Sequence, residues 1–165
     1  MSLSTNSNNY SEHLFPGASM QHTLLTLHPV LQGAGLYLFL HALYLGMQRF
    51  GQQHLGRKIV FRWQHHVIIG SLSLFLLASG ALLGLLVSRY QWQAIFVTGR
   101  HGYAVLLLFP FIIVTLGSGL YLHLHKKHSR ILPLLHGINN AVLFFLLLYQ
   151  TVTGWQVYQS LVLGN

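Results

Sequence analysis

Residues 62–87, RWQHHVIIGSLSLFLLASGALLGLLV, place two adjacent histidines in front of a long apolar run that contains no charged residue. An α-helix rises 1.5 Å per residue, so about 20 apolar residues cross the roughly 30 Å of hydrocarbon in a bilayer. The stretch therefore predicts a transmembrane helix over 66–87. A histidine at the end of such a helix needs partners for its ring nitrogens, because hydrocarbon supplies no water to bind them.

Three further apolar stretches, 24–47, 102–124 and 134–158, have the length of a membrane span. The chain of 165 residues is 53% hydrophobic and only 6% charged, whereas soluble domains average about 25% charged residues. We therefore expect an all-α integral membrane protein, a four-helix up-down-up-down bundle that occupies residues 23–165. Residues 1–22 are polar and lack a basic start and an apolar signal core, so we expect them to form an N-terminal tail.

The net charge of +8 suggests a nucleic-acid partner, but the positions of the basic residues argue against one. Seven of the nine lie in the first and third connections between spans: Arg49, Arg57, Lys58, Arg62, Lys126, Lys127 and Arg130. Positively charged connections stay in the cytoplasm. We therefore expect both termini on the periplasmic or lumenal side of a bacterial inner membrane or a cyanobacterial thylakoid.

The chain has no cysteine, and Glu12 is its one acidic residue. The first fact excludes disulfides, thiolate ligation, covalent haem attachment and cysteine-held iron–sulfur clusters. The second argues against catalysis by paired carboxylates and against a carboxylate proton relay inside the membrane. We expect no catalytic residue, and redox chemistry in this chain must use histidine.

Each predicted span carries a histidine at or near its N-terminal end. Because successive helices run in opposite directions, the first and third of these histidines share one depth, and the second and fourth share another. Two imidazoles that face each other across a bundle are the axial ligands of a b-type haem. We therefore predict two haem b groups, an outer one between His28 and His101 and a cytoplasmic one between His66 and His136, roughly 20 Å apart.

Glycines beside these histidines are candidates for letting a haem ring approach the backbone. Gly70 follows His66 by one turn, and Gly102 and Gly137 directly follow His101 and His136. Small-residue faces elsewhere could seat a helix, a haem or a partner subunit, and they comprise Gly80 with Gly84 and Gly117 with Gly119.

Three arginines lie near the expected haem sites: Arg62 and Arg130 on the cytoplasmic side and Arg100 on the outer side. A guanidinium group suits a charge-assisted hydrogen bond to a haem propionate. The alternative, equally favoured for each of them, is a charge that only sets the topology.

The remaining histidines have weaker patterns. His65 lies about 100° around its helix from His66, which places it at the membrane interface. His41 lies about 20 Å deeper than His28, so we expect it to bond a neighbouring helix, and haem-iron ligation by His41 or His65 is the weaker alternative. His123, His125 and His128 form an HxHxxH cluster that could hold a metal. The neighbouring lysines instead favour a solvated, positively charged segment.

Four motifs in order resemble the cytochrome b561 superfamily, and more closely a short four-helix membrane family common in cyanobacteria. They are LHPVLQGAGLY (27–37), QHHVIIGSLSLFLLASG (64–80), IFVTGRHGYAVLLL (95–108) and LHGINNAVLFFLLLYQTVTG (135–154). The resemblance implies a core of four helices that binds two haem b groups. It also implies that the ligand of the first helix pairs with that of the third, and the second with the fourth.

The sequence thus predicts a dihaem b-type cytochrome, a transmembrane electron-transfer oxidoreductase if it has a turnover activity. The expected partners are the lipid bilayer together with donor and acceptor proteins, a quinone or a small reductant. One alternative is a haem-bearing or structural accessory subunit of a larger respiratory or photosynthetic membrane complex. Another is a membrane protein that binds a transition metal through its histidines.

Overall fold

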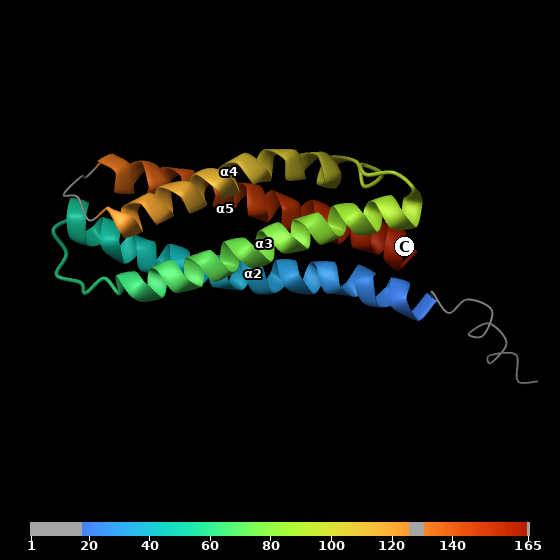
Figure 1. Cartoon of the computed structure of the whole chain (residues 1–165), viewed down its shortest axis with the longest axis horizontal. Coiled ribbons are helices and arrows are strands. Elements are labelled where there is room, and N and C mark those ends of the chain that lie inside the picture. Colours follow the sequence, from blue (N-terminus) through green and yellow to red (C-terminus); the bar gives the residue numbers. More distant parts are fainter. Residues whose placement is uncertain (1–17, 126–130, 165) are drawn as a thin grey trace, which may run out of the picture.

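The computed structural model describes residues 18–125 and 131–164, in which every regular secondary-structure element is a helix. The elements are α2 (Ala18–His54), α3 (Trp63–Trp92), α4 (Arg100–Leu124), α5 (Ile131–Val157) and the short π-helical segment η1 (Tyr158–Val162). Figure 1 shows the four long helices lying side by side along the longest axis of the molecule.

All four long helices are long and apolar enough to cross a membrane, over Leu25–His54, Trp63–Trp92, Arg100–Leu124 and Ile131–Leu161. This confirms the predicted all-helical class and the four membrane spans. Each of these segments has 25 to 31 residues, more than the about 20 that hydrocarbon requires. The α2 helix begins at Ala18, so the last residues of the segment expected as a tail are helical.

The connection between α3 and α4 is short and tightly held. Gln93 adopts a left-handed backbone with φ 55° and ends α3, and Gly99 with φ 56° precedes α4. Near the end of α3, the buried Ser88 hydroxyl donates to two carbonyls of this connection, those of Ala94, at 2.8 Å, and Ile95, at 3.0 Å. This fixed turn sets the position of the first residues of α4.

The closest packing occurs between α2 and α3 and between α4 and α5. In the first pair, a methyl group on Gly35 would lie 2.9 Å from Leu77 Cγ, so only glycine permits this approach. Two side chains also bond backbone carbonyls across the pair: Ser73 donates to Gly35, at 2.9 Å, and Gln32 donates to Leu77, at 3.1 Å. Side chains of each helix therefore contact the backbone of the other, which holds the two helices close together.

The α4–α5 pair is joined by amide side chains instead. The Asn139 side chain of α5 donates to Phe111 O, at 3.1 Å, and to Thr115 Oγ1, at 2.7 Å, both on α4. Within α5, Asn140 donates to His136 O, at 2.7 Å. Such bonds hold transmembrane helices in register, because no water competes for the polar groups.

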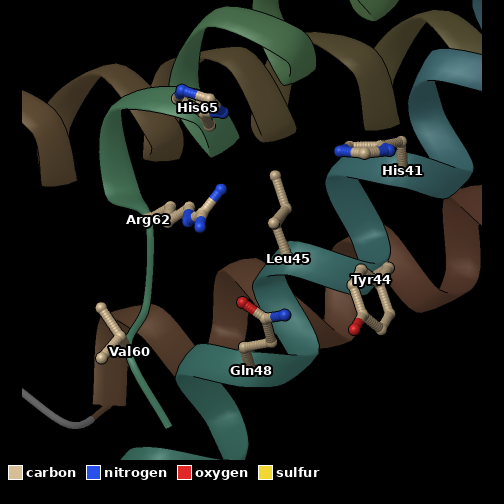
Figure 2. Close-up of a pocket in the computed structure, with 7 residues that line it drawn as sticks. All are labelled: His41, Tyr44, Leu45, Gln48, Val60, Arg62 and His65. Atoms are coloured by element: carbon tan, nitrogen blue, oxygen red, sulfur yellow. The ribbon is translucent and has the colours of Figure 1, made fainter.

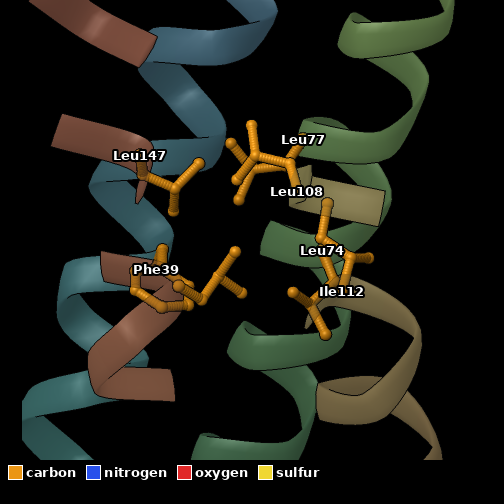
Figure 3. Close-up of a cluster of buried hydrophobic side chains, with 7 residues drawn as sticks. Phe39, Leu74, Leu77, Leu108, Ile112 and Leu147 are labelled. Carbon is orange, nitrogen blue, oxygen red and sulfur yellow. The ribbon is translucent and has the colours of Figure 1, made fainter. Parts of the chain in front are cut away.

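A cluster of buried apolar side chains fills the middle of the bundle, and Figure 3 shows residues from all four helices meeting there. Its members are Phe39, Leu74, Leu77, Leu108, Ile112, Leu143 and Leu147. Leu143 is fully buried. The cluster separates the two ends of the bundle, where the histidines lie.

Candidate functional site

The structure brings four histidines from four different helices together in two pairs. The ring centres of His28 (α2) and His101 (α4) are 6.2 Å apart, and those of His66 (α3) and His136 (α5) are 6.3 Å apart. These are the two pairs that the sequence predicts. Their role as haem ligands stays a prediction.

The separation of the rings fits two imidazoles that share one metal ion. A bond between a metal and an imidazole nitrogen is about 2.0 to 2.1 Å long, and the ring centre lies about 1.1 Å behind that nitrogen. Two imidazoles on opposite sides of one metal ion therefore have their centres about 6.3 Å apart. Edge-to-face ring pairs also have centres about 4.5 to 7 Å apart, so the separation is compatible with a haem iron at each site without requiring one.

Hydrogen bonds fix the tautomer of His28 and His66. Nδ1 of His28 lies 2.7 Å from the carbonyl oxygen of Gly80, and Nδ1 of His66 lies 2.9 Å from that of Ala42. A carbonyl oxygen only accepts, so Nδ1 must carry the proton in both rings. The Nε2 lone pair is then free to bind a metal, and the carbonyl orients the ring behind it.

His101 and His136 reach the same state through hydroxyl groups. Nδ1 of His101 lies 3.2 Å from Thr153 Oγ1, and Nδ1 of His136 lies 2.8 Å from Ser118 Oγ. Each hydroxyl also lies within hydrogen-bond distance of a carbonyl four residues earlier in its helix, so it can donate there and accept from the imidazole. This arrangement is compatible with a protonated Nδ1 and an available Nε2 in His101 and His136, as in the other two histidines.

A glycine on a neighbouring helix lies against each of the four rings. A methyl group added to Gly84 or Gly154 would lie 2.7 Å from His28 Cε1 or 2.9 Å from His101 Cε1, respectively. In the other pair, a methyl group on Gly46 or Gly119 would lie 3.4 Å from His66 Cε1 or 3.3 Å from His136 Cε1. The rings of the His28–His101 pair are thus seated more tightly than those of the His66–His136 pair.

These glycines follow a regular spacing in the sequence. Every long helix carries a glycine 18 residues after its histidine: His28 and Gly46, His66 and Gly84, His101 and Gly119, His136 and Gly154. Eighteen residues are five turns of about 3.6, so both residues lie on one face, about 27 Å apart along the helix. Each helix thus supplies a ligand candidate to one pair and a ring contact to the other. The repeated spacing could have revealed Gly46 and Gly154.

The three glycines proposed for ring approach lie elsewhere. A methyl group on Gly70 would make an ordinary contact of 3.7 Å with Ala42 Cβ, and one on Gly102 would meet Thr98 and Phe96. No described atom lies within 4 Å of a methyl group on Gly137. None of the three lies against a histidine ring, and their part in the approach of a haem ring stays a prediction.

The glycine contacts also indicate how far apart the two histidine pairs lie. The ring of His28 lies at the level of Gly84, and the ring of His66 lies at the level of Gly46. The helical rise over 18 residues corresponds to about 27 Å along the helix axis. The separation of roughly 20 Å expected between two haem irons stays a prediction.

The structure describes two of the three arginines that were proposed to bind haem propionates. Arg62 precedes α3 and Arg100 begins α4, both exposed and each next to the start of a ligand-bearing helix. Arg130 lies outside the described residues.

The other histidines lie apart from both pairs. His41 and His65 are exposed and line one pocket with Arg62. His123 packs against Trp63 with ring centres 5.3 Å apart, His125 stacks on Tyr121, and His128 lies outside the described residues. Within the described ranges, no three His, Cys, Asp or Glu side chains are grouped to hold a metal ion.

Comparison of the chain with protein-family models, with curated proteins and with solved structures gives no match.

Proposed function

We propose that this chain is a dihaem b-type cytochrome of the cytochrome b561-like kind, which carries electrons across a membrane between partners on its two faces. The observation that carries the proposal is the ring-centre distance of 6.2 Å in one histidine pair and 6.3 Å in the other. Both distances match two imidazoles bound to opposite sides of one metal ion. With no cysteine in the chain, a histidine-ligated haem b is the redox group that these residues suit.

When bound, each haem supplies a centre that gains and loses one electron. The protein's own residues hold and tune that centre. Nε2 of the four histidines would bind iron, and the acceptors behind Nδ1 would keep the rings oriented and raise their basicity. The central apolar cluster excludes water between the sites, so charge can pass through the bundle without opening a path for ions.

Contacts between the helices support the up-down-up-down course. His28, near the start of α2, lies against Gly84, near the end of α3, while His66, near the start of α3, lies against Gly46, late in α2. The α4–α5 pair repeats this arrangement with His101 and Gly154. Together with the basic first and third connections, this course supports the proposal that both termini lie on the non-cytoplasmic side of a bacterial inner membrane or a thylakoid and that the His66–His136 site lies toward the cytoplasm.

The proposal is tested by haem content and by electron transfer across a sealed membrane. Pyridine-haemochrome quantitation and a reduced-minus-oxidised spectrum of the purified protein should give two haem b per chain. Liposomes that contain the protein and enclose ferricyanide should then bleach when a membrane-impermeant reductant is added outside. Liposomes without protein, or with His66→Ala protein, should not bleach faster than the leak. Absence of haem would refute the proposal, and haem without transfer would restrict the protein to an accessory role.

A further inference from the structure

A pocket of about 590 Å³ opens beside the cytoplasmic histidine pair, on the outer surface of α2 and the start of α3. Figure 2 shows the residues that line it: His41, Tyr44, Leu45, Gln48, Val60, Arg62 and His65. None of them belongs to a histidine pair. The pocket nevertheless adjoins that site, because His65 precedes His66, and Leu45 precedes the glycine that contacts the His66 ring.

Hydrogen-bond donors from α2 and from Arg62, which precedes α3, converge on this pocket. In Figure 2, the His41 ring and the Arg62 guanidinium group reach toward the same space from opposite sides, with Leu45 between them and the Gln48 amide at the edge. Within the described part of the chain, these polar side chains make no hydrogen bond with one another or with any other residue. Their hydrogen-bonding capacity is available to a ligand.

The depth of the pocket indicates what kind of ligand suits it. Gly46 lies at the level of His66, near the predicted membrane boundary, and His41 lies five residues before it on α2, about 7.5 Å deeper. An exposed imidazole at that depth faces hydrocarbon, where a polar group without a hydrogen-bond partner is strongly disfavoured. Gln48 and Arg62 lie toward the interface. The donors therefore extend from the interface into the hydrocarbon.

We propose that this pocket binds a quinone. A quinone head group is a flat, uncharged ring with a carbonyl acceptor on each side, so one oxygen can accept from His41 within the membrane and the other from Arg62 or Gln48 nearer the surface. Leu45 and Val60 offer apolar contact to the ring, and the isoprenoid tail stays in the bilayer. The volume lies within the range of small-molecule sites, about 300 to 1,000 Å³.

The depth of His41 favours a quinone over an anionic lipid. A phosphate group would have to leave the interface to reach the imidazole, and a charge inside hydrocarbon is far costlier than a carbonyl. The choice of a redox-active ring rests on the proposed function, because a quinone beside the His66–His136 site would be its electron partner.

The test uses photolabelling and affinity on the full-length protein in detergent. A short-tailed azidoquinone should label peptides that contain His41 to Gln48 or Val60 to His65, and excess decylplastoquinone should prevent labelling. Loss of one donor in His41→Leu, Gln48→Leu or Arg62→Leu should weaken binding about five- to tenfold. His54→Leu, late in the same helix, and Arg89→Leu, late in α3, are matched controls that should bind like the wild type.

Labelling outside the pocket, or equal affinity in all the variants, would overturn the inference. Competition by phosphatidylglycerol with no competition by decylplastoquinone would overturn it in favour of a lipid head group. Haem content measured on the same samples separates the two proposals. Quinone binding by protein without haem supports the pocket and refutes the cytochrome, whereas haem-loaded protein that binds no quinone refutes the pocket alone.

Discussion

A methyl group on Gly84 would lie 2.7 Å from Cε1 of His28, a distance at which two carbon atoms strongly repel each other. The ring cannot easily turn away, because its Nδ1 is bonded to Gly80 O on the same neighbouring helix. Gly84 therefore fixes where the His28 ring can lie, although it is 56 residues away in the chain (84 minus 28).

Substitution of either tight glycine should disrupt the outer site. Gly84→Ala and Gly154→Ala push the rings of His28 and His101 out of position, so each variant should lose the haem of that site and keep the other. Haem per chain, by pyridine haemochrome, should fall from two to one. Gly33→Ala, in α2, is the matched control, since nothing lies within 4 Å of the added methyl group, and it should retain both haems.

The corresponding glycines of the cytoplasmic site should tolerate alanine better. The added methyl group would lie 3.4 Å from the His66 ring in Gly46→Ala and 3.3 Å from the His136 ring in Gly119→Ala, so a shift of a few tenths of an ångström suffices. Both variants should keep two haems and show a shifted midpoint potential for one of them. The potential is measured by optical redox titration, with Gly117→Ala as the control. Complete loss of a haem here would contradict the difference in tightness between the two sites.

Removal of the hydroxyl behind a ligand should affect one haem selectively. Thr153→Ala takes away the acceptor of His101 Nδ1–H, which lowers the basicity of the ring and stabilises ferric iron less. The midpoint potential of the outer haem should rise and its affinity should fall about 10- to 100-fold. Thr153→Ser keeps the hydroxyl and should restore both values. Thr151→Ala is the control, because that hydroxyl bonds Leu147 O within its own helix. An unchanged potential in Thr153→Ala would show that this bond does not tune the ligand.

The relative orientation of the paired rings predicts a spectroscopic signature. The ring planes meet at 76° in the outer pair and at 80° in the cytoplasmic pair. Perpendicular imidazoles leave two iron d orbitals nearly equal in energy, so the oxidised protein should give strongly anisotropic low-spin EPR signals with one large g value. Rhombic signals, which arise from parallel ring planes, would show that the rings rotate on binding haem.

The membrane spans and the four ligand candidates were predictable because each rests on local sequence. Apolar length defines a span, and a histidine near the start of each helix shares its depth with the one two helices away. The glycine contacts with the histidine rings depend on which faces of neighbouring helices meet, and proximity in sequence is no guide to that, so Gly46 and Gly154 were missed. The hydrogen-bond partners of Nδ1 could not be predicted from the sequence either, because each lies on a different helix from its histidine. These partners are Gly80, Ala42, Thr153 and Ser118.

The most direct test of the central claim is the haem content of double histidine variants. If His28 and His101 share one haem, His28→Ala/His101→Ala should lose no more than either single variant and should retain one haem per chain. His28→Ala/His66→Ala, which removes one ligand from each pair, should retain none. We expect one haem per chain in the first double variant and none in the second. The reverse pattern would contradict the pairing, and two haems in both variants would show that these histidines are not the ligands.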